Sequence, residues 1–325
     1  MVTAHTRSGR QGNFRKKITL FFVALLGFAT VVTSCVIFLK SGEMRQTNIL
    51  VVGDPMFLVI ADSGSEKFTV LKIPADVQIE GVYGVGRYSL RSLWNLGLLS
   101  KKSHDLLTKS LSEALAVPVE LYINPAGRTV EATASEIETL KGAFSFRTIF
   151  SFMHSGVSTN IPAFTSVQLA WFFRSTGIDR LQTIDMGEST AISTERLPDN
   201  AEVPVFDPNG FDATIELAFE TRAIRKEALS ITIYNTTEVP LLGQRVSRLL
   251  GHIGAHVVSI KNDVTPRVKC EVRGSETALK SKTAQLITSY YHCDAALLSE
   301  QGEEDLEFRI GHDYRAMFLP KSGGN

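Results

Sequence analysis

Two features of this sequence have residue types that could do chemistry, a pair of histidines and a glycine-rich segment. His252 and His256 are four residues apart, but Gly254 between them interrupts a helix. We therefore do not expect the two imidazoles on one helical face, and we predict no metal site there. The segment Gly81 to Arg87 lacks the spacing of a dinucleotide fingerprint and is typical of a hairpin tip. The sequence contains no G-x-S-x-G, H-E-x-x-H or C-x-x-C motif. The spacing of its residues therefore predicts no set of catalytic residues.

The elements that would position a site begin with a buried strand. Asn48 to Asp54 is an apolar run ended by Gly-Asp-Pro, which is typical of such a strand. Phe57 to Ala61 and Phe68 to Ile73 flank a polar turn and predict a hairpin. Further along we expect a proline-rich loop at 199–210, a strand at Val119–Ile123, and helices at Tyr88–Leu99, His104–Leu115, Phe164–Ser175 and Phe211–Glu220.

A second unit follows, and its pattern of strands and helices is clear. The predicted order is strand Leu229–Tyr234, helix Leu241–Gly251, strand His256–Ile260, strand Arg267–Val272, helix Glu276–Tyr290, strand Ala295–Leu298 and strand Glu307–Ile310. A β-α-β-β-α-β-β order of this length predicts a two-layer sandwich, with helices packed on one face of a mixed sheet. The fold class we expect for the whole body is therefore α/β.

The distribution of charge and hydropathy predicts a membrane anchor. Residues 1–17 hold five basic residues and no acid, and the rest of the chain has 29 basic residues against 34 acidic ones. Residues 18–39 form a run of 22 residues without a charge, which at about 1.5 Å per residue spans the roughly 30 Å hydrocarbon layer. Basic flanks stay in the cytoplasm. We expect a single-pass anchor in the cytoplasmic membrane, with the N-terminus inside and the body extracytoplasmic.

The acidic body speaks against nucleic acid as a partner, because it repels phosphate. At the end of the apolar run, Val32 to Cys35 resembles a bacterial lipobox. Lipidation of Cys35 is the alternative to the uncleaved anchor, and it leaves the body outside the cytoplasm as well.

Cys270 and Cys293 lie in or next to two strands that flank the second helix of the C-terminal unit. If these strands are parallel neighbours joined by a right-handed crossover, their starting ends lie side by side. The two Cα atoms could then be within the roughly 4.4–6.8 Å that a disulfide needs. An extracytoplasmic location favours oxidation, so we predict a disulfide. Two unpaired buried cysteines are the alternative.

The C-terminal unit also resembles a known family domain. Ile231 to Thr237 is similar to the opening strand and Asn-Thr-Thr turn of the LytR-CpsA-Psr regulator C-terminal domain. Gln244 to Ala255 is similar to its first helix and the turn that follows, and Gly311 to Tyr314 is similar to its closing Gly-x-Asp-Tyr. The resemblance covers residues 229–314 and implies that domain's fold. It does not imply a ligand.

The segment Asn48 to Ile123 resembles, more weakly, the front of the LytR-CpsA-Psr phosphotransferase domain. Enzymes of that family transfer a polyprenyl-pyrophosphate-linked glycopolymer to peptidoglycan outside the membrane. Leu71 to Asp76 is similar to the family's Ser-Ile-Pro-Arg-Asp strand end, but Ala75 stands where the family has a pyrophosphate-binding arginine. The family's Arg-Ser-Asp-Thr segment is missing, because Asp54-Pro55-Met56 leads directly into Phe57.

These departures remove the arginine forks that would offset the charge of a pyrophosphate. The resemblance then leaves Asp54 and Asp76 as remnant acids of a site whose catalytic residues are unknown. Arg87 and Arg91, one helical turn apart, are the nearby bases that could compensate, although we interpret them as a solvated face.

We therefore expect five segments: a cytoplasmic basic tail (1–17), a transmembrane anchor (18–39), a degenerate LytR-CpsA-Psr-like domain (46–225), a C-terminal domain (228–315) and a tail (316–325). The predicted function is binding or scaffolding in the bacterial cell envelope without catalysis, and without a cofactor or metal. Expected partners are the membrane and either a cell-wall glycopolymer or envelope proteins. The alternative is a divergent phosphotransferase that uses Mg²⁺ and attaches lipid-linked glycopolymers to peptidoglycan.

Overall fold

The computed structural model describes Gly27, Thr30 and residues 46–62, 67–100, 103–124, 158–175, 181–215, 218–298 and 304–315. The chain separates into two compact units, Met1–Met44 and Arg45–Asn325. Apart from Gly27 and Thr30, the predicted anchor at 18–39 lies outside the described residues. Within those residues, no helix has the length and the apolar character needed to cross a membrane.

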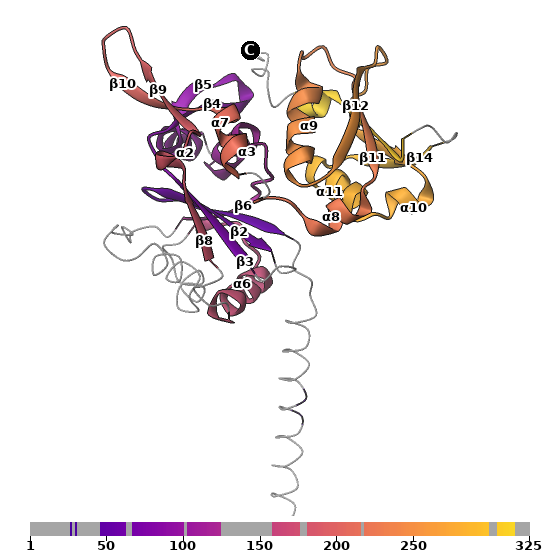
Figure 1. The fold of residues 1–325 in the computed structure, drawn as a ribbon, viewed down its shortest axis with the longest axis horizontal. Coiled ribbons are helices and arrows are strands. Elements are labelled where there is room, and N and C mark those ends of the chain that lie inside the picture. Colours follow the sequence, from indigo (N-terminus) through magenta and orange to yellow (C-terminus); the bar gives the residue numbers. More distant parts are fainter. Residues whose placement is uncertain are drawn as a thin grey trace, which may run out of the picture. The chain divides into compact units, whose positions relative to one another are not determined.

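The first part of Arg45–Asn325 is built on a six-stranded sheet with the order β7-β6-β1-β2-β3-β8. Its strands β2, β3, β6 and β8 are labelled in Figure 1. Its strands are β1 (Thr47–Val51), β2 (Met56–Asp62), β3 (Lys67–Ile73), β6 (Leu121–Asn124), β7 (Ser158–Thr159) and β8 (Leu181–Asp185). β2 pairs antiparallel with both β1 and β3, which confirms the predicted hairpin. β6 runs parallel to β1, and β8 runs parallel to β3. The strands β1, β3, β6 and β8 therefore end at the same edge of the sheet, called the carboxyl edge below.

A smaller sheet and several helices complete this part. The sheet has the order β5-β4-β10-β9 and contains β4 (Gln78–Gly81), β5 (Gly86–Ser89), β9 (Ile192–Arg196) and β10 (Glu202–Phe206). The helices are α2 (Leu90–Leu99), α3 (Ser103–Leu115), α6 (Ala163–Ser175), α7 (Pro208–Ile215) and α8 (Arg222–Glu227), with short 3-10 turns η1 (Val82–Gly84) and η3 (Met186–Glu188). One apolar core joins both sheets to α2, α3 and α7.

Three expectations about this part are wrong in detail. The helix predicted from Tyr88 begins at Leu90, because Gly86–Ser89 pairs with β4 and the Ser89 hydroxyl caps the helix by accepting from Ser92 N at 3.2 Å. The expected loop at 199–210 contains β10, which pairs antiparallel with β9. The helix predicted at Phe211–Glu220 begins earlier, at Pro208, after Asp207 accepts from Asn209 N at 3.0 Å, and it ends at Ile215.

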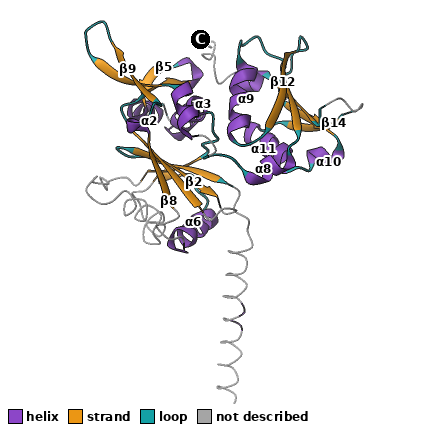
Figure 2. Cartoon of the chain, in the orientation of Figure 1, coloured by secondary structure: helices purple, strands orange, loops and turns teal. Residues whose placement is uncertain are grey.

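The C-terminal unit contains the predicted β-α-β-β-α-β-β order. Its elements are β11 (Ser230–Asn235), α9 (Leu242–His252), β12 (His256–Asn262), β13 (Glu271–Gly274), α10 (Glu276–Leu279), α11 (Lys282–Tyr291), β14 (Asp294–Leu297), β15 (Leu306–Ile310) and the short α12 (His312–Arg315). The sheet is mixed, in the order β12-β11-β15-β13-β14, and α9 and α11 lie on one face of it (Figure 2). The second predicted helix is two helices, because Ser281 starts a new one by accepting from Ala284 N at 3.0 Å.

Candidate functional site

Asp54 and Asp76, the two acids that the sequence resemblance singles out, lie at the carboxyl edge of the six-stranded sheet. Asp54 follows β1 and Asp76 follows β3, two strands of the same direction on either side of β2. Asp76 is exposed. β1 ends at Val51 and β2 begins at Met56, so the connection between them has no room for an additional arginine-bearing segment.

Ala75 is completely buried, with a relative exposure of 0%. Its methyl group belongs to the apolar core, and its carbonyl oxygen accepts a hydrogen bond from Arg91 N at 2.9 Å. The side chain of this buried alanine offers a ligand neither a charge nor a hydrogen-bond donor.

The two arginines that could have compensated are both paired with acids. Arg91 of α2 forms an ion pair with Asp54, and Arg87 of β5 forms one with Glu195 at 2.6 Å. They do not share a helix, contrary to the expected spacing of one helical turn, because Arg87 precedes the start of α2. Both side chains are about half exposed, 56% for Arg91 and 47% for Arg87. This agrees with the interpretation of a solvated face.

The structure adds a pair that the sequence did not indicate. Lys72 Nζ at the end of β3 lies 2.7 Å from the Asp185 carboxylate at the end of β8, and Asp185 also accepts from Gly187 N at 2.9 Å. The adjacent β-branched residues Thr183 and Ile184 were the available signal for β8. With this pair, the edge carries the carboxylates of Asp54, Asp76 and Asp185 against the cations of Arg91 and Lys72.

This arrangement does not fit Mg²⁺ well. Mg²⁺ prefers carboxylate oxygens in octahedral geometry, but the Asp54 carboxylate is occupied by Arg91 and the Asp185 carboxylate by Lys72. In the described part of the chain, no three His, Cys, Asp or Glu side chains gather as a metal site would require.

The two histidines are separated by the end of a helix. His252 ends α9 and His256 begins β12, with Gly254 between them at a φ of +92°. His252 Nδ1 lies 3.0 Å from the Ala116 carbonyl oxygen, which can only accept, so Nδ1 carries the proton. Burial lowers the pKa of His252, and this outweighs the nearby Asp212 carboxylate, which raises it.

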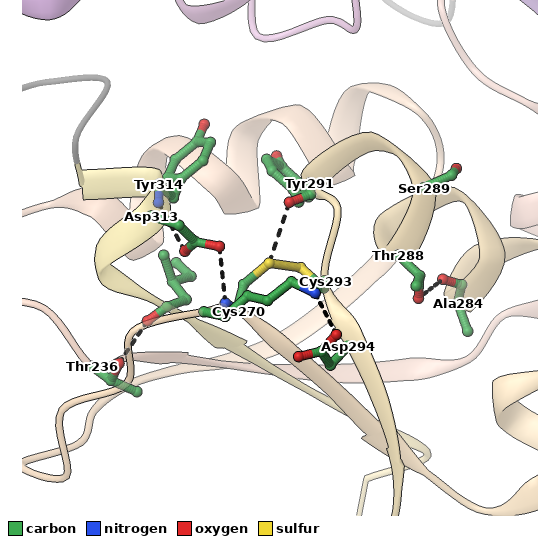
Figure 3. The surroundings of a disulfide bond; sticks show 12 residues. Thr236, Cys270, Ala284, Thr288, Ser289, Tyr291, Cys293, Asp294, Asp313 and Tyr314 are labelled. Atoms are coloured by element: carbon green, nitrogen blue, oxygen red, sulfur yellow. Dashed lines mark hydrogen bonds and ion pairs between the residues drawn. A yellow bond between two sulfur atoms is a disulfide. The ribbon is translucent and has the colours of Figure 1, made fainter.

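The C-terminal unit contains a disulfide between Cys270 and Cys293 (Figure 3). The S–S distance is 2.00 Å and the Cα atoms are 4.7 Å apart. The two cysteines directly precede β13 and β14, which are parallel neighbours as predicted. Both residues are buried, with exposures of 1% and 6%.

Residues of the segments that carry the sequence resemblance form hydrogen bonds close to the disulfide. The Asp313 carboxylate accepts from Cys270 N at 3.2 Å, and the Thr236 hydroxyl donates to the Ile310 carbonyl at 2.7 Å. Gly311 leaves room for this contact, since a Cβ at that position would lie 2.5 Å from the Lys269 backbone. These contacts connect the closing segment and the turn after β11 to the sheet.

No protein-family model matches this chain, and no curated protein matches it. Solved structures of limited likeness exist. Bacillus subtilis TagV is 11% identical over 65% of this chain and 97% of its own, with a TM-score of 0.39. B. subtilis TagU is 11% identical over 54% of this chain and 96% of its own, with a TM-score of 0.38. A structure of TagT bound to LIIa-WTA is 12% identical over 53% of this chain and 88% of its own, with a TM-score of 0.40.

Proposed function

We propose that this chain is a membrane-anchored, extracytoplasmic protein of the bacterial cell envelope that binds or scaffolds and does not transfer glycopolymers. The observation that carries the proposal is the fully buried Ala75, at the position where the sequence resemblance to LytR-CpsA-Psr phosphotransferases requires an arginine. That family likeness itself rests on the residues quoted in the sequence analysis.

Electrostatics at the carboxyl edge support the absence of catalysis. Transfer from a pyrophosphate relies on arginine forks and a metal that offset the charge of the transition state. Here Arg91 and Lys72 are already neutralised by Asp54 and Asp185, and Asp76 adds a negative charge. A pyrophosphate would compete with Asp54 and Asp185 for these cations, and the charge of Asp76 would repel it.

The extracytoplasmic location is supported by two independent features. The basic tail 1–17 and the uncharged run 18–39 favour an anchor with the body outside. The geometry of Cys270 and Cys293 suits a disulfide, and such bonds persist in oxidising compartments. The partners we propose are the membrane and a cell-wall glycopolymer or envelope proteins.

The test is an assay for metal-dependent phosphate release from a lipid-linked oligosaccharide by a purified fragment of residues 45–325. We expect no product with or without Mg²⁺, and no binding of a polyprenyl pyrophosphate. Asp76→Ala should change stability or binding without abolishing any transfer. Release that requires Mg²⁺ and disappears in Asp76→Ala would establish the divergent phosphotransferase instead.

The binding role has its own measurement. Peptidoglycan that carries its native glycopolymer is sedimented with the fragment, and peptidoglycan stripped of glycopolymer serves as the control. Co-sedimentation with the first preparation alone would identify the glycopolymer as the ligand. Equal recovery with both would direct the search to envelope proteins.

A further inference from the structure

The end of α3 in the first part of the chain is bonded to side chains of α9 in the C-terminal unit. Arg248 Nη1 donates to the Ala114 carbonyl oxygen at 2.9 Å, and His252 Nδ1 donates to that of Ala116 at 3.0 Å. The last carbonyl groups of a helix have no partner within the helix, and basic side chains can satisfy them and also complement the helix dipole. The end of α3, a helix of the first part of the chain, is thus capped by side chains of the C-terminal unit.

The same arginine also binds α7. Arg248 Nε lies 3.0 and 2.8 Å from the two oxygens of Asp212, and Nη2 lies 2.6 Å from one of them. This is a two-pronged guanidinium–carboxylate contact with side-chain exposures of 23% and 36%, which is stronger and more directional than a single ion pair. His252 Nε2 lies 3.2 Å from the same carboxylate.

A second contact lies at Glu113, the residue before Ala114 on α3. The Tyr314 hydroxyl of the closing motif donates to the Glu113 carboxylate, and Tyr314 packs edge to face on Tyr291 of α11 with ring centroids 5.1 Å apart. Burial raises the pKa of Glu113, so this carboxylate depends on its few partners. Ala116 itself is part of the C-terminal core.

Together these contacts tie α3 and α7 to α9 and α12. We propose that the C-terminal unit is a clamp, in which Arg248, His252 and Tyr314 hold the end of α3 in its folded position. The first part of the chain then depends on this clamp for the order of α3. α2, which carries Arg91, packs along α3 in one core. The ion pair of Arg91 with Asp54 at the carboxyl edge therefore belongs to the state in which the clamp is closed.

Hydrogen exchange by mass spectrometry on the full-length chain in detergent tests the clamp. Arg248→Met removes the guanidinium, and Tyr314→Phe removes only the hydroxyl. We expect both variants to exchange the amides of α3 and α7 faster than wild type, by at least about tenfold for Arg248→Met, the change that follows from losing a charge-assisted hydrogen bond. The matched control is Arg273→Met, since Arg273 pairs with Glu271 at a similar exposure of 29% but on the sheet.

The clamp is refuted if exchange in α3 equals that of wild type in both interface variants, or if Arg273→Met raises it equally. If Arg248→Met is unfolded, its amides exchange quickly throughout the chain. In that case the exchange of Tyr314→Phe decides whether the clamp exists. A rise confined to α3 and α7 in that variant supports the clamp, and a uniform rise or none overturns it.

Discussion

The residue that bears most directly on ligand binding is Ala75, and its burial allows a sharp test. Ala75→Arg would restore the residue type expected from the family resemblance, but it would place a long cationic side chain where the native exposure is 0%. We expect the free energy of unfolding to fall by at least about 3 kcal/mol, because the core must open or bury a charge. Denaturant unfolding of residues 45–325 measures this change.

The neighbouring position supplies the control. Asp76 is exposed, so Asp76→Arg adds the same side chain in solvent and should change the free energy of unfolding by about 0.5 kcal/mol or less. Equal stability of the two variants would show that position 75 can accommodate an arginine, and the structural case against pyrophosphate binding would fail.

A pH dependence follows from His252. Burial lowers the pKa of His252 in the folded chain below the ordinary histidine value of 6.5, so between these two pKa values the unfolded chain binds more protons. Stability from this group is then fully present above about pH 6.5 and is lost as the pH falls toward the folded pKa. In His252→Gln that part of the pH dependence should disappear.

The measurement is thermal or denaturant unfolding of wild type and His252→Gln across about pH 5–7.5, the range in which histidine titrates. His256→Gln is the control, because His256 is exposed at the start of β12. If wild type and His252→Gln keep the same pH slope, protonation of His252 does not oppose folding.

At the scale of secondary structure elements, the disulfide that links the starts of β13 and β14 allows a specific prediction. Cys270 and Cys293 close a loop with a sequence separation of 23 residues, which restricts the unfolded chain. Replacing both cysteines with serine should therefore lower the free energy of unfolding by about 3 kcal/mol. Wild-type protein under full reduction should behave similarly, and it serves as the matched control.

The bond itself is checked by thiol labelling of the denatured, unreduced C-terminal fragment 228–325, purified from an oxidising compartment. We expect no reactive thiol. Two labelled thiols would mean that the cysteines stay reduced in the core, which was the alternative drawn from the sequence.

For the whole molecule, the prediction concerns topology. The basic tail and the uncharged run 18–39 should place everything after residue 40 outside the cytoplasm. A reporter that is active only in the cytoplasm, fused after Asn325, should therefore give no signal, whereas a reporter that is active only outside should give one. The reverse pattern would remove the envelope function together with the topology.

The amino-acid sequence by itself determined the features that depend on local periodicity and on charge. The order of strands and helices from Ser230 to Ile310 could be predicted, because each element buries one face and its apolar residues repeat with the period of that element. That order, together with the handedness of crossovers, also predicted that the strands next to Cys270 and Cys293 are parallel neighbours. The excess of basic residues in 1–17 is likewise a property of the sequence alone, and it predicts the orientation of the anchor.

The tertiary structure decided the features that join residues far apart in sequence. β10 became a strand through pairing with β9 and β4, although its prolines favoured a loop. Arg87 and Arg91 looked available in the sequence, but folding brought them to Glu195 and Asp54. The bonds from α9 to the end of α3 had no sequence signal at all. A local pattern records how a segment buries its own apolar face, whereas the partner of a charge or of a helix end is set by which distant segments fold against it.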